Sequence, residues 1–151
     1  RQRLERRQVG SWTLYDDTYN ANPDSARAAL DLVAALPGRR VFVLGDMLEL
    51  GQLSPELHHG IGMHAAARGI DLFVAVGPLA AAAAAGALEG GLDAGRVRHF
   101  PGVERALEVF PSLLEPGDSV VLKASRGVRL ERLVERLLEL GRLEPAVEGG
   151  N

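Results

Sequence analysis

Three continuous apolar runs, each closed by a glycine or by polar residues, constrain the fold of this chain most strongly. Residues 41–44 (VFVL) precede Gly45, and residues 72–76 (LFVAV) precede Gly77. A third run, SVVL at 119–122, ends at Lys123. Unbroken apolar runs of this length are typical of strands buried on both faces, as in parallel sheets. Helices on both sides of such a sheet are needed to cover it.

Segments with helical spacing separate the apolar runs. The sequence Asn22-Pro23-Asp24 places a capping side chain, a proline and an acid at the start of one helix, which Pro37-Gly38 ends. A second helix is expected from an N-cap at Ser54, followed by Pro55, to about residue 68, and a third from Pro78 through an alanine-rich tract. A fourth is expected from about residue 103 until Pro111 ends or kinks it, and a fifth over 128–140.

Alternating strands and helices predict an α/β domain with a Rossmann-like, three-layer architecture: a mostly parallel sheet with helices on both faces. Residues 12–15 are expected to form an N-terminal strand or hairpin after the turn at Gly10, and 97–100 a weaker strand. Because no linker or repeat divides the chain, residues 1–151 are predicted to be a single domain. Residues 1–11 are then a lead-in segment, and 142–151 a frayed tail.

Composition and charge exclude several classes of function. The 151 residues are 46% hydrophobic, which is enough for a real core, and carry a formal net charge of −3. The low charge and the absence of a basic tract argue against a nucleic-acid partner. No run of 18 apolar residues is present, so no membrane span is expected. Zero cysteines exclude disulfides and thiolate metal sites and fit the cytoplasm. A start at Arg1 suggests a piece of something longer.

Polar residues follow the predicted strands, where ligands bind in open α/β sheets. The loop at 16–22 offers two carboxylates, two amides, a hydroxyl and a phenol before a helix start. Carboxylates suit ribose hydroxyls, and amides suit base edges or a peptide ligand. Asn22 taken alone is read as a helix cap, whereas the rest of the loop is richer than a cap requires.

The loop at 45–51 holds Asp46 and Glu49 between two glycines. These acids could receive an ammonium group or could simply be solvated. Neither GxxxxGK[ST] nor GxGxxG occurs in the chain, and Gly60-Ile61-Gly62 lies inside a predicted helix. Dinucleotide binding is therefore disfavoured despite the fold.

The stretch Lys123-Ala124-Ser125-Arg126 places two cations and a hydroxyl at a strand end before a helix. This arrangement suits a phosphate or carboxylate. Sixteen of the 17 basic residues are arginines, so Lys123 is the only lysine. The retention of this single lysine reflects either codon bias or a requirement for a compact ammonium group.

The histidines lack a metal-site pattern. His58, His59 and His64 lie near Glu56, but no HExxH spacing links them, and surface or helix-packing roles are expected. A substitution at His58 is predicted to be nearly silent. No Ser-His-Asp arrangement can be proposed.

Three of these stretches together resemble the carboxy-terminal domain of Mur ligases: DTYNANPDS at 17–25, VLGDMLELG at 43–51 and LKASR at 122–126. The combination is most similar to the branch that adds D-alanyl-D-alanine to UDP-N-acetylmuramoyl-tripeptide. The resemblance covers the chain from about Trp12 to Leu138. One departure is Ala124, where the branch usually has glycine.

The resemblance implies the last domain of a three-domain, ATP-dependent amide ligase, with ATP and Mg²⁺ bound mainly by the central domain. No catalytic or metal-ligating residue is expected in this domain alone, and the enzyme is expected to be a monomer whose other domains contact this one. The implied nucleotide-binding residues are Asp17, Asn20 and Asn22. The implied residues for the substrates, D-alanyl-D-alanine and UDP-N-acetylmuramoyl-tripeptide, are Asp46, Met47, Glu49, Lys123, Ser125 and Arg126.

Two alternatives remain open at the level of sequence. One is another amino-acid ligase of the same family, although those relatives tend to carry an Asp-Tyr-Ala-His-type loop where Tyr19-Asn20-Ala21-Asn22 stands here. The other is a non-catalytic Rossmann-like module that binds a small molecule.

Overall fold

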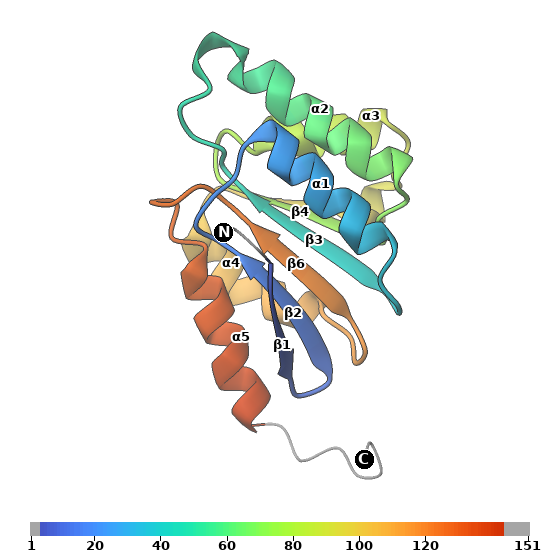
Figure 1. The fold of residues 1–151 in the computed structure, drawn as a ribbon, viewed down its shortest axis with the longest axis vertical. Helices are drawn as coiled ribbons and strands as arrows, with labels where there is room; N and C mark the ends of the chain where they lie inside the picture. Colours follow the sequence, from blue (N-terminus) through green and yellow to red (C-terminus); the bar gives the residue numbers. More distant parts are fainter. Residues whose placement is uncertain (1–3, 144–151) are drawn as a thin grey trace.

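The computed structural model describes residues 4–143 and contains one six-stranded sheet in the order β1-β2-β6-β3-β4-β5. Only the β1–β2 pair is antiparallel, and the other four pairings are parallel. Figure 1 shows the sheet running through the centre of the molecule. The strands are β1 (Glu5–Val9), β2 (Trp12–Asp17), β3 (Arg40–Gly45), β4 (Leu72–Val76), β5 (Val97–Phe100) and β6 (Ser119–Lys123).

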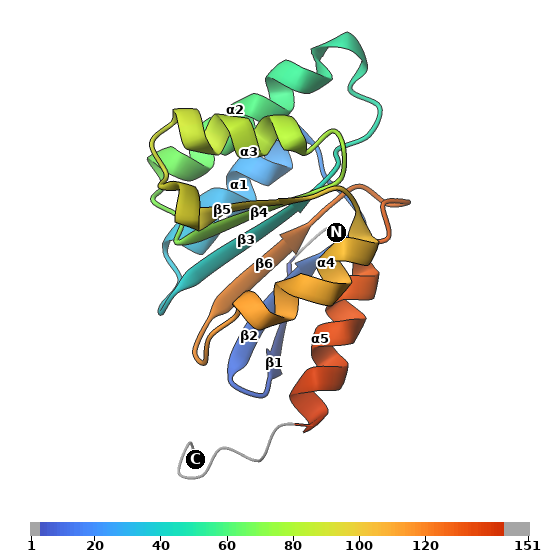
Figure 2. The same cartoon turned by 180° about the vertical axis from the view of Figure 1, so that it is seen from behind.

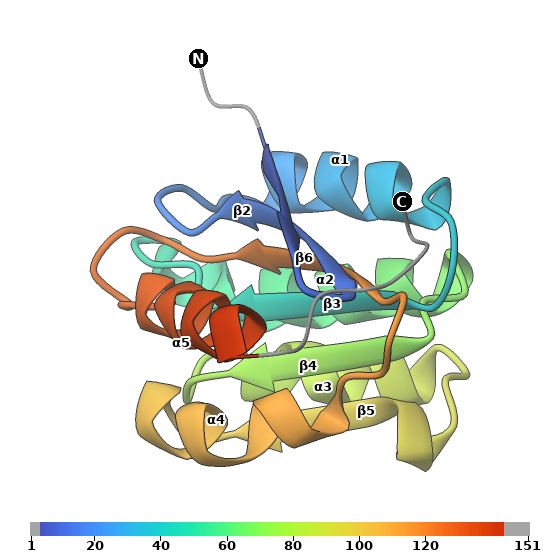
Figure 3. The same cartoon turned by 90° about the horizontal axis from the view of Figure 1, so that it is seen from below.

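Helices cover both faces of this sheet, which confirms the predicted α/β, Rossmann-like fold with three layers (Figures 1 and 2). One face carries α1, α2 and α3, and the other carries α4 and α5 (Figure 2). Figure 3 shows α1 and α4 at opposite sides of the strands. The helices are α1 (Pro23–Ala34), α2 (Ser54–Ala67), α3 (Ala81–Glu89), α4 (Val103–Val109) and α5 (Glu131–Leu143), with short 3₁₀ turns η1 (Gly51–Leu53), η2 (Ala94–Arg96) and η3 (Phe110–Leu113).

Two hydrophobic cores follow from the alternation of side chains along the strands. On β3, Phe42 and Leu44 face the core under α1, α2 and α3, whereas Val41 and Val43 face the core under α4 and α5. All residues of β4 and β6 are buried, as expected for strands covered on both sides.

The first strand pair extends further than the sequence predicted. β1 and β2 form the expected hairpin, turning at Gly10, whose φ of 59° suits glycine. β2, however, continues through Asp16 and Asp17 instead of ending at Tyr15, because its parallel pairing with β6 runs on to the pair Asp17↔Lys123. The predicted loop at 16–22 therefore begins with two strand residues, and this register sets Asp17 beside Lys123.

The sequence predicted the starts of α1, α2 and α4 to within about one residue, although only α1 has a side-chain cap. Asn22 is the N-cap of α1: its Oδ1 accepts from the Ser25 backbone N–H at 2.8 Å, and the Ser25 hydroxyl closes a capping box. Ser54 is not an N-cap, because η1 precedes it and its own backbone is already helical. α3 begins at Ala81, three residues after Pro78.

The last helix is shifted towards the C-terminus relative to the prediction of 128–140. α5 runs from Glu131 to Leu143, so Arg142, predicted to begin the frayed tail, is helical. The rest of the predicted tail, 144–151, lies outside the described residues.

Glycines bring α2 and α3 into close contact. A Cβ added at Gly62 would collide with the backbone of Ala83, and one added at Gly86 would collide with the backbone of His59. Gly62, which the sequence placed inside a helix without a ligand role, therefore serves helix packing.

Candidate functional site

The three motif-bearing loops meet at the carboxyl edge of the sheet, and Ser125 joins them. The Ser125 hydroxyl accepts from the Leu48 backbone N–H at 2.9 Å and donates to the Ala21 carbonyl at 3.3 Å. Its backbone N–H donates to the Asp46 carbonyl at 3.2 Å. One small residue thus links the loops after β2, β3 and β6, because parallel strands end at the same edge.

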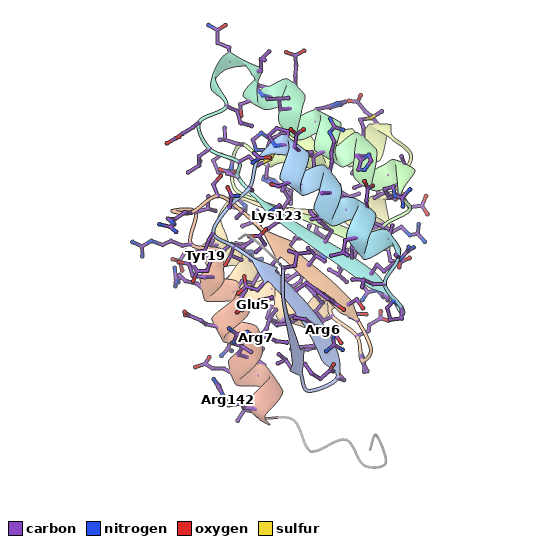
Figure 4. The ribbon with its side chains drawn as sticks, viewed as in Figure 1. Glu5, Arg6, Arg7, Tyr19, Lys123 and Arg142 are labelled. Carbon is purple, nitrogen blue, oxygen red and sulfur yellow. The ribbon has the colours of Figure 1, made fainter. Side chains whose placement is uncertain are left out.

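Lys123 is buried beneath this junction and pairs with Asp17 (Figure 4). Its Nζ donates to Asp17 Oδ2 at 2.6 Å and to the Asn20 carbonyl at 2.8 Å. The Lys123 side chain is only 1% exposed, and that of Asp17 is 11% exposed. A compact ammonium on a flexible stem fits this site better than a planar guanidinium, which gives the single lysine a physical reason. Lys123 is therefore not the open anion receptor that the sequence suggested.

A pocket with a volume of ≈ 310 Å³ opens beside this ion pair. Its lining has both polar and apolar residues, and α1 supplies three of the four apolar ones. Its lining residues are Leu4, Asp17, Asn20, Ser25, Ala28, Ala29, Leu32 and Lys123. A carboxylate, an amide and a buried ammonium beside an apolar wall suit a nucleoside, whose sugar carries hydroxyl groups and whose base has flat faces that pack on apolar side chains.

Asp46 ties the second loop to the start of α3. Its Oδ1 accepts from the Ala80 backbone N–H at 2.7 Å, and its carboxylate packs against Gly77, whose φ of 118° requires glycine. A second pocket of ≈ 270 Å³ lies on this side of the junction. It is lined by Asp46, Leu48, Val76, Gly77, Pro78, Pro101, Gly102, Val103, Gly127 and Val128.

The remaining residues of this loop divide between core and surface. The Met47 side chain is fully buried in the core under α1, α2 and α3, so we assign it to packing in place of the predicted substrate contact. Glu49 is exposed and has a φ of 64°, an unusual conformation for a residue with a side chain. Arg129, with a φ of 70°, repeats this feature in the loop after β6.

The sequence did not predict the contact that His58 makes with the loop at 45–51. The side chain is fully buried in α2, and its Nε2 accepts from the Met47 backbone N–H at 3.0 Å. The interaction joins residues eleven positions apart, and no sequence spacing predicts such a contact. His59 pairs instead with Glu89 at 3.1 Å, and His64 pairs with Asp31 at 2.8 Å.

Tyr19 was also left out of the predicted site. Tyr19, labelled in Figure 4, is 56% exposed, and the Arg126 guanidinium lies over its ring at 6.0 Å from the centroid. The pair places a cation and an aromatic face at the rim, where a cation–π contact holds the exposed arginine in position.

Asp16 and Asn22 have their side chains engaged locally. Burial raises the pKa of the Asp16 carboxyl above its ordinary value, although Thr18 donates to it from both its backbone N–H and its hydroxyl. The Asn22 carbonyl oxygen caps α1, which leaves its amide group exposed beside the loop.

Comparison of the sequence with known protein families identifies the family of this chain. Residues 2–126 match the family described as "Mur ligase, glutamate ligase domain". The chain belongs to the Mur ligase family. The match spans all three loops that meet at Ser125.

Two curated relatives of this chain carry the same name. The UDP-N-acetylmuramoyl-tripeptide–D-alanyl-D-alanine ligase of Bacillus subtilis is 37% identical over 129 residues, which cover 84% of this chain and 28% of that enzyme. The protein of the same name from Synechocystis is 40% identical, over 83% of this chain and 27% of its own length. This chain thus spans less than a third of these relatives.

Solved Mur ligase structures are also similar. A crystal structure of MurF from Acinetobacter baumannii has a TM-score of 0.81 and 37% identity, covering 91% of this chain and 30% of that one. MurF from Thermotoga maritima, solved in complex with ADP, has a TM-score of 0.76 and 26% identity over 93% of this chain and 31% of that one.

Two features are absent from the described residues, 4–143. No helix in that range is both long enough and apolar enough to span a bilayer. Within the same range, no three or more His, Asp or Glu side chains gather where they could hold a metal ion.

Proposed function

We propose that this chain is the carboxy-terminal domain of an ATP-dependent ligase that joins D-alanyl-D-alanine to UDP-N-acetylmuramoyl-tripeptide in peptidoglycan precursor synthesis. The observation that carries the proposal is the meeting of three loops at Ser125, with one pocket beside Asp17 and another beside Asp46. The names of the relatives support the same reaction. The proposal places the reaction in the cytoplasm and the enzyme as a monomer.

The pocket beside Asp17 is assigned to the nucleotide. Lys123 occupies one oxygen of the Asp17 carboxylate, and the other is available to accept from a ribose hydroxyl. Asn20 lines the same pocket, and Asn22, two residues further along the loop, is exposed and lies outside the lining. The ADP complex of the Thermotoga relative supports a nucleotide as ligand. Phosphates and Mg²⁺ are assigned to parts of the protein outside this chain.

The loop at 45–51, called the acidic loop from here on, and the exposed Arg126 are assigned to the dipeptide. Asp46 and Glu49 would receive its ammonium group, and Arg126 its carboxylate or nearby phosphate oxygens. Lys123 and Ser125 would act indirectly, by holding the loops in place. In the proposed reaction ATP phosphorylates the tripeptide carboxylate to an acyl phosphate. The dipeptide amine then attacks the carbonyl of the acyl phosphate, and phosphate leaves. This domain contributes positioning and charge stabilisation.

Steady-state kinetics of the full-length protein test the assignment. Asp17→Ala and Arg126→Ala should each lower kcat/KM on the order of tenfold to a hundredfold, because each removes a hydrogen bond to a charged or polar ligand group. Arg98→Ala is the matched control for Arg126, since Arg98 is also exposed and lies over an aromatic ring, that of Phe100. Unchanged kinetics in both site variants would contradict the assignment of these residues. Turnover of free amino acids in place of the dipeptide would contradict the proposed substrate and indicate another amino-acid ligase of the family.

A further inference from the structure

His58 holds the acidic loop from below through its two ring nitrogens. Nε2 lies 3.0 Å from the Met47 backbone nitrogen, and Nδ1 lies 2.8 Å from the Ser54 carbonyl oxygen. Because a backbone N–H can only donate, Nε2 must be the unprotonated acceptor. The ring proton then sits on Nδ1 and is donated to Ser54. Both nitrogens are thereby satisfied, as a fully buried imidazole requires.

The loop is fixed at three successive residues by this contact and by Ser125. The Asp46 carbonyl accepts from the Ser125 N–H, the Met47 N–H is taken by His58, and the Leu48 N–H is taken by the Ser125 hydroxyl. The next residue, Glu49, has a φ of 64°. A residue with a side chain keeps such a conformation only where its surroundings over-determine it. The three bonds supply that constraint immediately before Glu49.

We propose that His58 is a positioning residue that sets the acidic loop for the incoming amine substrate. The inference rests on the proposed function, because it assigns the loop's Asp46 and Glu49 to the dipeptide ammonium. His58 is not a catalytic residue, since it is fully buried and its ring nitrogens bond to main-chain groups and the Ser54 hydroxyl. The expectation that a change at His58 is nearly silent is thereby replaced.

Three variants of the full-length protein test this role. His58→Leu fills the space but removes the acceptor for Met47, whereas His58→Gln places an amide oxygen near the position of Nε2. His59→Leu is the matched control, because His59 is the next residue of the same helix and its side chain is 35% exposed. Thermal unfolding of each variant establishes that it is folded before kinetics are measured.

Kinetics with D-alanyl-D-alanine and ATP varied separately give the decisive readout. We expect His58→Leu to raise KM for the dipeptide about tenfold, because the Met47 N–H is left without a partner and the loop relaxes. KM for ATP should change less than about twofold, since the nucleotide pocket is held by Lys123 instead. His58→Gln should restore most of the loss, and His59→Leu should match the wild type. Amide hydrogen exchange at Met47 and Leu48 should accelerate in His58→Leu alone.

The outcomes separate this inference from the proposed function. A wild-type protein that does not use D-alanyl-D-alanine would overturn the proposed function and, with it, the substrate named here. An active wild type whose dipeptide KM and loop exchange are unchanged in His58→Leu would overturn the role of His58 alone. Equal rises in KM for dipeptide and ATP, without rescue by glutamine, would mark a general loss of structure and also overturn it.

Discussion

β6 has a buried ion pair at each end, and the two pairs are built differently. At its carboxyl end, Lys123 reaches both Asp17 and the Asn20 carbonyl beside a pocket. Just before its amino end, Asp118 accepts from Arg39 and from the Glu115 N–H, each at 2.8 Å, within a tight turn. Asp118 Oδ1 has no hydrogen-bond partner among the described residues. The first pair anchors a loop next to a cavity, whereas the second closes a turn.

Removing the lysine should have the largest effect. Lys123→Met leaves the Asp17 carboxylate nearly buried without a cation, and we expect the free energy of unfolding to fall by about 3 kcal/mol. Adding Asp17→Asn to this variant should recover part of the loss but not nucleotide binding, since the amide cannot replace the carboxylate at the ribose. Urea unfolding and ADP titration measure the two effects. A loss below about 1 kcal/mol would mean that the buried charge is well solvated.

Breaking the other pair should affect stability without affecting ligands. Arg39→Met leaves the fully buried Asp118 without its cation, at a cost of about 2 kcal/mol in the free energy of unfolding. The Arg39 side chain is 27% exposed, which makes this cost smaller than that at Lys123. Because the turn lies at the opposite end of β6, KM values of the full-length protein should stay at wild-type levels. Weakened nucleotide binding in Arg39→Met would contradict the proposed difference between the two ends of β6.

The smallest effect is a dependence on pH at Asp118. Burial raises the pKa of the Asp118 carboxyl above its ordinary value, despite the hydrogen bonds from Glu115 and Arg39. Because this pKa is higher in the folded state than in the unfolded chain, ionisation opposes folding: the cost is absent below the ordinary value and complete above the folded one. Relative to Asp118→Asn, the wild type should therefore lose stability as pH rises through this window.

Urea unfolding at several pH values between 4 and 7 measures that slope. Asp93→Asn, an exposed position, is the control. A wild type that gains stability with rising pH relative to Asp118→Asn would show that Arg39 outweighs the cost of burial.

Local patterns predicted the elements of the fold, and long-range contacts decided the details of the site. The apolar runs gave β3, β4 and β6, and the complete cap at Asn22 gave the start of α1, because these signals lie within a few residues. The continuation of β2 to Asp17 depends on pairing with β6, more than a hundred residues away. The burial of Lys123 and the contact of His58 with Met47 arise in the same way, from packing between distant segments.

Gly45 and Ala124 share room for one methyl group where β3 and β6 end. A Cβ built on Gly45 would lie 2.7 Å from the Cβ of Ala124, closer than two carbons can approach. The methyl group of Ala124 is thus accommodated because its neighbour Gly45 has no side chain. The two positions therefore act as one unit of volume: a side chain can be added at Gly45 only if the methyl group of Ala124 is removed or displaced.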